Sequence, residues 1–203
     1  MRALKFIFRT FLILFVLGFI AAGAGGYWAY THYSADLPEV DTLRDTKFQT
    51  PLRIYSADNK LIAEFGEKKR TPVKFEQIPK RFVQALLAAE DAKFFEHPGI
   101  DIKGLARAGY QLATTRQIKT GGSTITMQVA KNFFLTRERS FERKFREILL
   151  SFQIEEELSK EQIFELYVNK IFLGHRSYGI QAAANVYYGK SLDELSTAQL
   201  AMI

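Results

Sequence analysis

The feature that most constrains this chain is the absence of Asp, Glu, Lys and Arg between residues 10 and 34. About 25 such residues are long enough to cross the hydrocarbon core of a bilayer as one helix. The flanking charges differ in sign: Arg2, Lys5 and Arg9 precede the run, and Asp36, Glu39 and Asp41 follow it. The positive-inside rule therefore predicts a cytoplasmic N-terminus and an external position for everything after Asp36.

The outer end of this run is rich in aromatic residues, which are typical of a membrane–water interface. They are Tyr27, Trp28, Tyr30 and Tyr33. The alternative is a signal peptide that is cleaved near Ala22-Gly23-Ala24. We favour an uncleaved anchor because the uncharged run continues well past that point.

The charge pattern divides the chain into four parts. Residues 1–9 form a cytoplasmic tail, 10–34 the transmembrane anchor, 35–50 a polar connector and 51–203 one domain, which is long enough to bury its own core. The formal net charge of +6 favours an anionic partner, and the anchor favours a membrane over nucleic acid. The lack of cysteine excludes disulfides, thiolate zinc sites and cysteine nucleophiles.

Within the domain, the sequence predicts a small β element followed by helices. Apolar residues on both sides of a turn signal at 57–60 indicate a hairpin within 51–75. From Pro79 onward apolar residues recur at helical spacing, and capping boxes begin at Ser159 and Ser191. Residues 197–203 are apolar and contain no helix stop signal, so we expect a fragment of a longer protein.

Two adjacent carboxylates, Glu90 and Asp91, stand where the helix from Pro79 is expected to end, shortly before Pro98 and Gly99. A neighbouring negative charge and a helix C-terminus both favour the protonated form of a carboxyl group. A carboxylate that binds protons more readily than usual suits a general base near neutral pH. The alternative is a pair of solvated acids at the end of a helix.

A glycine pair at 121–122 leads into Ser123 or Thr124 as the N-cap of the next helix. On that helix Thr124, Gln128 and Lys131 share one face, because they lie four and three residues apart. A hydroxyl, an amide and an ammonium near a helix N-terminus can hold a phosphate group. The alternative is an ordinary capped amphipathic helix.

A third polar group is the pair Arg143 and Glu147, which are four residues apart in a segment of helical pattern. Such neighbours form an ion pair on one helix face. The alternative to a functional role is a surface salt bridge that contributes little to stability.

These segments, together with 160–174 and the stretch that begins at Ala182, resemble in order the motifs of the glycosyltransferase family 51 domain. That domain occurs in class A penicillin-binding proteins and in monofunctional peptidoglycan glycosyltransferases. The resemblance implies a mainly α, lysozyme-like glycosyltransferase domain with a small β element, on one N-terminal transmembrane helix. It also implies that a further lysine, the closing helices and a transpeptidase domain follow Ile203 in the longer protein.

The resemblance further implies roles for individual residues. Glu90 is the catalytic carboxylate, which deprotonates the attacking sugar hydroxyl, and Glu147 orients Lys131 and Arg143 or assists the second sugar site. The implied substrate-binding residues are Asp91, Phe94, His97, Ser123, Thr124, Gln128, Lys131 and Arg143.

The implied reaction polymerises lipid II into β-1,4 glycan strands by inverting transfer from an undecaprenyl-pyrophosphate donor, outside the inner membrane. Partners would be lipid II, the growing glycan strand, the membrane and cell-wall synthesis proteins, with no nucleic acid. No cofactor is required by the pattern, although Mg²⁺ or Mn²⁺ on the substrate pyrophosphate stays open. Residues 100–118, with Leu105, Tyr110 and Leu112 among basic residues, are the expected membrane-touching segment.

Two alternatives remain at this point. A lytic enzyme of lysozyme-like fold would cleave the same glycan with one key glutamate. An inactive membrane-anchored scaffold would bind the substrate or partner proteins without turnover.

Overall fold

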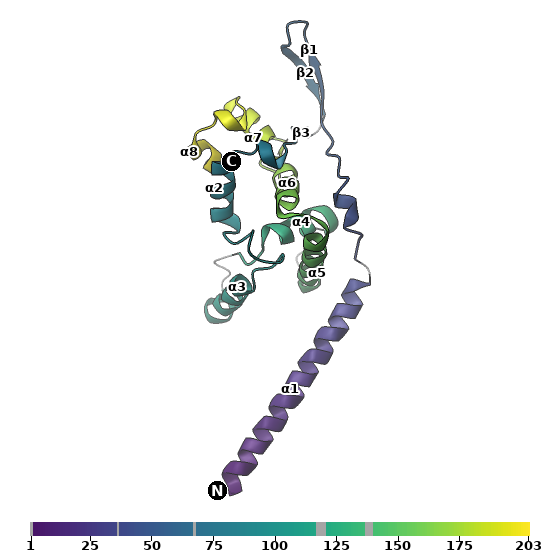
Figure 1. The fold of residues 1–203 in the computed structure, drawn as a ribbon, viewed down its shortest axis with the longest axis vertical. Helices are drawn as coiled ribbons and strands as arrows, with labels where there is room; N and C mark the ends of the chain where they lie inside the picture. Colours follow the sequence, from purple (N-terminus) through teal and green to yellow (C-terminus); the bar gives the residue numbers. More distant parts are fainter. Residues whose placement is uncertain (1, 36, 67, 117–120, 137–139) are drawn as a thin grey trace. The chain divides into compact units, whose positions relative to one another are not determined.

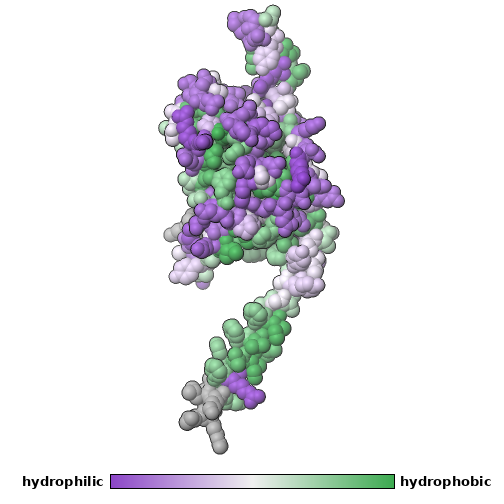
Figure 2. Space-filling model, viewed as in Figure 1, coloured by the Kyte–Doolittle hydropathy of each residue, from purple (hydrophilic) through white to green (hydrophobic). Residues whose placement is uncertain are grey.

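The computed structural model describes residues 2–35, 37–66, 68–116, 121–136 and 140–203. They form two units, Met1–Pro38 and Glu39–Ile203. The first unit is built on helix α1 (Arg2–Ser34), in which Phe8–Ser34 is long and apolar enough to cross a membrane. Apolar side chains cover this span of α1 (Figure 2). A helix of the length and composition predicted for the anchor is therefore present, whereas the flanking Asp36 lies outside the described residues.

The second unit is mainly helical, as predicted, with two small sheets (Figure 1). Its elements are η1 (Asp41–Leu43), β1 (Leu52–Tyr55), β2 (Leu61–Phe65), β3 (Lys69–Arg70), η2 (Phe75–Gln77), α2 (Lys80–Glu90), α3 (Ile102–Thr115), α4 (Ile125–Phe134), α5 (Phe141–Glu157), α6 (Lys160–Lys170), β4 (Ser177–Tyr178), α7 (Ile180–Tyr188), η3 (Leu192–Glu194) and α8 (Thr197–Met202).

The predicted hairpin consists of β1 and β2, which pair antiparallel. Asn59 adopts a left-handed conformation with φ of 59° in the turn, as asparagine tolerates better than most residues. The backbone N–H of Ser56 closes the turn by donating to the carbonyl of Lys60 at 2.9 Å. Strands β3 and β4 form a second, parallel pair, although more than 100 residues separate them in the sequence. No local sequence pattern predicts that second pairing.

The core of the domain surrounds α4, which packs against α5 and α6 (Figure 1). Ile125, Met127 and Val129 on α4 are fully buried, and so are Leu150 on α5 and Phe164 on α6. The side chain of Thr124 caps α4 by accepting a hydrogen bond from the backbone N–H of Met127. Because α4 is held on two sides, its remaining polar face has a fixed direction.

Most of the segment predicted as a polar connector, from Glu39 to residue 50, belongs to the larger unit. Val40 and Leu43 are buried, and Arg44 donates to both the backbone and the carboxylate of Glu157 at 2.8 Å. Farther along, the ring of Phe48 packs edge-on against Phe133 of α4. Residues 39–48 therefore form a strap on the helical domain, and this strap carries buried contacts of its own.

Candidate functional site

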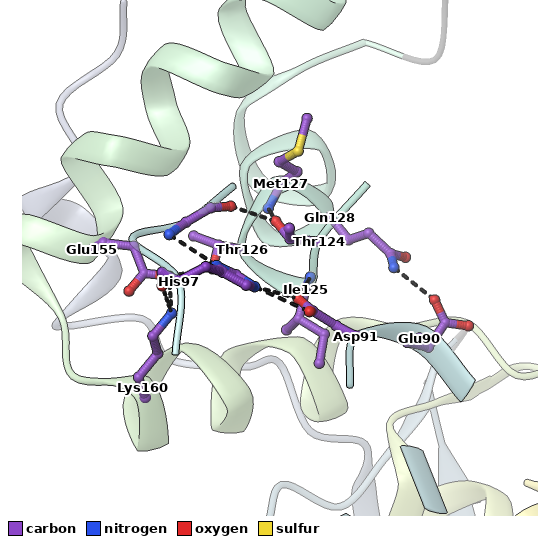
Figure 3. A network of polar contacts seen from close by, with 11 residues as sticks. Glu90, Asp91, His97, Thr124, Ile125, Thr126, Met127, Gln128, Glu155 and Lys160 are labelled. Atoms are coloured by element: carbon purple, nitrogen blue, oxygen red, sulfur yellow. Dashed lines mark hydrogen bonds and ion pairs between the residues drawn. The ribbon is translucent and has the colours of Figure 1, made fainter. Parts of the chain in front are cut away.

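Glu90 is the last residue of α2, and its side chain is exposed. One carboxylate oxygen accepts a hydrogen bond from Nε2 of Gln128 at 2.8 Å (Figure 3). Glu90 lines a pocket of about 160 Å³ together with Arg107 of α3 and Ser123 before α4. The helix end, the glycine-led loop and the polar face of α4 therefore meet at this carboxylate. The sequence selected Glu90 and Gln128 for separate roles and did not predict their contact.

Asp91 points away from Glu90 into the domain and is 8% exposed (Figure 3). Its carboxylate lies 2.9 Å from Nε2 of His97 and accepts the backbone N–H of Ile125 at 3.0 Å. The two adjacent acids thus occupy different surroundings: one is open to solvent, and the other holds the first amide of α4. Asp91 lines the same pocket as Glu90, but its carboxylate is held by His97 and by the start of α4.

His97 is also buried, and its ring has two defined partners. The backbone N–H of Gly99 donates to Nδ1 at 3.2 Å, so Nε2 carries the ring proton and donates to Asp91. Phe94 is fully buried beside this ring. The ammonium of Lys160 lies 4.6 Å from the centroid of Phe94 and donates to the carbonyl of His97. These side chains support the segment after Glu90 and do not face the pocket themselves.

Gly99 fills a position that no other residue fits easily. Its φ is +93°, and a Cβ there would lie 2.8 Å from the carbonyl oxygen of Ser151. Its own carbonyl accepts the hydroxyl proton of Thr124 at 2.5 Å. Because Thr124 also caps α4, both hydrogen-bonding roles of its hydroxyl are used inside the domain. Thr124 therefore fixes the start of α4, whereas Gln128 and Lys131 carry the accessible polar groups of that face.

Lys131 and Arg143 line a second cavity, of about 500 Å³, with Lys170, Phe172 and Tyr178. The structure thus brings together the two cations that the sequence assigned to one anionic group. It also adds Lys170, the last residue of α6, which the sequence analysis did not select. The cavity is consequently rich in positive charge on an aromatic wall.

Glu147 is 2% exposed and lies between two cations. Its carboxylate is 3.0 Å from Nε of Arg143 and 2.9 Å from Nζ of Lys144. Lys144 also donates to the hydroxyl of Ser123 at 2.6 Å. The predicted pairing of Arg143 with Glu147 is present, but the second cation of the pair is Lys144 and not Lys131. This chain of contacts connects α5 to the loop that begins α4.

Tyr167 of α6 is a further residue of interest, which the sequence analysis did not select. Burial, and then the negative charge of Glu90, raises the pKa of the Tyr167 phenol well above its ordinary value of 10. The phenol therefore stays protonated near Glu90 at any ordinary pH. Helical spacing in the sequence does not distinguish a buried tyrosine with a raised pKa from the apolar residues beside it.

The described residues contain no group of three or more His, Cys, Asp or Glu that could hold a metal ion. Of the carboxylates near the two pockets, Glu90 accepts a hydrogen bond from Gln128 and Glu147 contacts two cations.

Residues 58–203 match the family described as Transglycosylase. The chain is 56% identical over 203 residues to penicillin-binding protein 1A of Pseudomonas aeruginosa, covering all of this chain and 24% of the relative. It is 46% identical over 200 residues to penicillin-binding protein 1A of Escherichia coli, covering 98% of this chain and 23% of the relative. The chain thus spans about a quarter of the length of these curated relatives.

Among solved structures, the crystal structure of penicillin-binding protein 1A from Haemophilus influenzae is 32% identical. The match covers 76% of this chain and 13% of that chain, with a TM-score of 0.32. The sequence relatives are class A penicillin-binding proteins, the group to which the motifs pointed.

Proposed function

The chain belongs to the transglycosylase family, and from this premise we propose that it polymerises a lipid-linked disaccharide into peptidoglycan strands. One observation carries the proposal: a single exposed glutamate and a cationic cavity are joined by one face of α4. Gln128 on that face binds Glu90, and Lys131, one turn later, lines the cavity. A glycosyl transfer from a diphosphate donor requires a base for the attacking hydroxyl and cations for the leaving group.

Glu90 is the base in this proposal. It removes the proton from the 4-hydroxyl of the acceptor sugar, lipid II, while that oxygen attacks the anomeric carbon of the donor. Its exposure at a pocket leaves room for a sugar hydroxyl, and the hydrogen bond from Gln128 fixes one carboxylate oxygen. The other oxygen is thereby directed toward the pocket. A single displacement inverts the anomeric centre and gives a β-1,4 bond.

Lys131 and Arg143 stabilise the leaving undecaprenyl pyrophosphate. As the glycosidic bond breaks, negative charge concentrates on the diphosphate, and preorganised cations lower the energy of that transition state. Glu147 holds Arg143 from the buried side at 3.0 Å, so the guanidinium is already in place before the substrate binds. Lys144 fixes the loop at Ser123 in the same way.

Two features support action at a membrane. Helix α1 is long and apolar enough to anchor the chain, with the N-terminus in the cytoplasm and the domain outside the inner membrane. Within the domain, α3 exposes Ile102, Tyr110 and Leu112, which suits contact with lipid. Residues 117 and 118 of the expected lipid-contacting segment lie outside the described residues. An enzyme that touches the bilayer can use a donor and an acceptor whose lipid tails stay in it.

A lytic activity is the second candidate, since a glutamate at a pocket also serves glycan cleavage. The cavity around Lys131 and Arg143 disfavours it, because cleavage of a glycan creates no diphosphate to stabilise. A scaffold without turnover would not need Gln128 to fix the carboxylate of Glu90.

The decisive experiment incubates the detergent-solubilised chain with labelled lipid II and resolves the products on a gel. We expect polymer from the parent chain and at least about a 100-fold slower reaction from Glu90→Gln. Glu96→Gln, an exposed acid nearby, is the matched control and should polymerise normally. Equal polymerisation by the Glu90 variant would remove that residue from its role, and release of soluble fragments from purified cell wall would favour the lytic alternative.

A further inference from the structure

The cationic cavity is surrounded by more positive charge than the reaction described above assigns. Lys131, Arg143 and Lys170 line it, and Lys68 and Arg70 lie over the ring of Tyr178, another lining residue. The ammonium of Lys68 is 5.4 Å and the guanidinium carbon of Arg70 is 5.3 Å from the ring centroid of Tyr178, which is part of that wall. None of the described residues that line the cavity is an aspartate or a glutamate.

Arg70 is an unusual residue in this cluster because it is buried, at 7% exposure, without a carboxylate in ion-pair range among the described residues. Aromatic faces take the place of an acid: Arg70 lies 5.0 Å from the centroid of Phe48 as well as against Tyr178. Its Nε is buried without a hydrogen-bond partner. A cation buried in this way carries an unfavourable free energy of desolvation, which an anion nearby would offset.

Lys170 connects this buried charge to the cavity. Its ammonium stands 4.2 Å from the ring centroid of Phe133 on α4, so the end of α6 is held against α4. Burial, followed by the positive charges of Arg70 and Lys68, lowers the pKa of Lys170 from its ordinary value. The like charges therefore oppose the protonated form of Lys170 until a negative group enters the cavity.

We propose that Lys170 is a third cation of the subsite for the substrate diphosphate, with Arg70 as a positioning residue that acts through Tyr178 and Lys170. This inference rests on the proposed function and extends it. Three cations line the cavity, and the one acid that pairs with any of them, Glu147 beside Arg143, also pairs with Lys144 among the described residues. At least two positive charges therefore remain for the ligand. A diphosphate supplies at least that much negative charge, whereas a single carboxylate of the substrate peptide would leave at least one cation unmatched.

The test measures binding without turnover. The full chain in detergent is titrated calorimetrically with inorganic pyrophosphate, and in a parallel arm with the soluble disaccharide-pentapeptide that lacks the diphosphate. We expect Lys170→Met to weaken pyrophosphate binding about 10-fold, as loss of a charge-assisted contact does, and Lys170→Arg to retain most of it. Lys80→Met, an exposed lysine at the start of α2, is the matched control and should bind normally.

The role of Arg70 is tested by combining its variant with Lys170→Met and measuring whether their effects on pyrophosphate binding depend on each other. If Arg70 had only a structural role, its effect on binding would not depend on Lys170. Arg70→Lys keeps the charge but loses the flat stacking surface, and it should weaken pyrophosphate binding less than Lys170→Met does. The double variant should show less than the sum of the two losses in binding free energy. Additive losses would overturn the role of Arg70.

The proposal as a whole is overturned if Lys170→Met binds pyrophosphate as tightly as the parent chain. It is equally overturned if that variant loses affinity only for the disaccharide-pentapeptide, since the lysine then serves a carboxylate. Failure of the proposed function is separate: a chain that binds pyrophosphate through Lys170 but forms no polymer from lipid II would contradict the polymerase and leave this subsite in place.

Discussion

Asp91 and His97 form a buried pair in which both carboxylate oxygens of the acid lie within 3.0 Å of Nε2 of the histidine. One of those oxygens also accepts the first backbone N–H of α4, from Ile125. The pair thereby ties the turn after α2 to the start of α4. Glu90 precedes Asp91 and Gln128 follows Ile125 by three residues, so this buried link sets the distance between the exposed carboxylate and the amide that binds it.

Replacing Asp91 by Asn should destabilise the domain by about 1–3 kcal/mol, the usual effect of an unsatisfied buried donor. The new amide nitrogen would face either the ring N–H of His97 or the N–H of Ile125, both of which donate. Urea unfolding of the detergent-solubilised chain gives the free energy. Asp45→Asn, at an exposed position, provides the control. Equal stability of both variants would show that the buried link carries little free energy.

Replacing Gln128 by Met should slow polymerisation about 10-fold and leave the free energy of unfolding within about 1 kcal/mol of the parent. The variant keeps the length of the side chain and loses the 2.8 Å hydrogen bond that fixes Glu90. Initial rates with labelled lipid II measure the effect. Unchanged rates would mean that the carboxylate is oriented by the substrate instead.

Replacing Glu147 by Gln should destabilise the domain by about 3 kcal/mol, because it removes the charge partner of two cations at a buried position. It should also reduce polymerisation, since Arg143 loses its fixed position beside the cavity. Adding Lys144→Met to the Glu147→Gln variant removes one of the cations that lost its charge partner and should recover part of the free energy of unfolding. No recovery in chemical unfolding would show that Lys144 does not depend on Glu147.

Lys170→Met should raise the melting temperature at pH 7 while weakening anion binding. A lysine whose pKa is lower in the folded state than in the unfolded state binds fewer protons when folded. Its charge therefore destabilises the fold below the lowered pKa, and that penalty disappears as the pH rises toward 10.5. The charged groups around it are Lys68, Arg70, Lys131 and Arg143.

The difference in melting temperature between Lys170→Met and the parent should therefore narrow as the pH approaches 10.5. Lys80→Met should show no such dependence. A lower melting temperature for the Lys170 variant at neutral pH would contradict a destabilising charge, and would mean that its contact with Phe133 outweighs the repulsion.

Local patterns were sufficient to predict much of the fold. The hairpin around Asn59, the helix that ends at Glu90 and the capped starts at Thr124 and Ser159 all depend on residues within a few positions of one another. The pairing of β3 with β4 could not be predicted in this way, because it joins Lys69 to Ser177. Helices α4 and α6 lie between the two strands in the sequence.

In the candidate site, too, local spacing predicted some relations, and tertiary packing determined the others. The ion pair of Arg143 with Glu147 was predicted from spacing along one helix, and the structure contains it. Glu90 and Gln128 were selected separately, and the fold adds the hydrogen bond between them. Spacing does not reveal which side chains are used inside the domain. Thr124 carries a hydroxyl suited to phosphate, but the tertiary fold directs that hydroxyl to the carbonyl of Gly99. Lys170 meets the cavity only through the packing of α6 on α4.

The strap formed by residues 39–48 determines where a recombinant version of this chain without the apolar helix α1 should begin. Leu43 lines a pocket of about 270 Å³ with Leu158 and Leu166, both of which are buried beneath it. A recombinant version that starts at residue 51 would uncover these leucines and invite aggregation. Starting at Glu39 removes the apolar helix and keeps the strap, including the bond from Arg44 to Glu157. A form without α1 is therefore best begun at Glu39, twelve residues before the domain boundary at 51 that the charge pattern predicted.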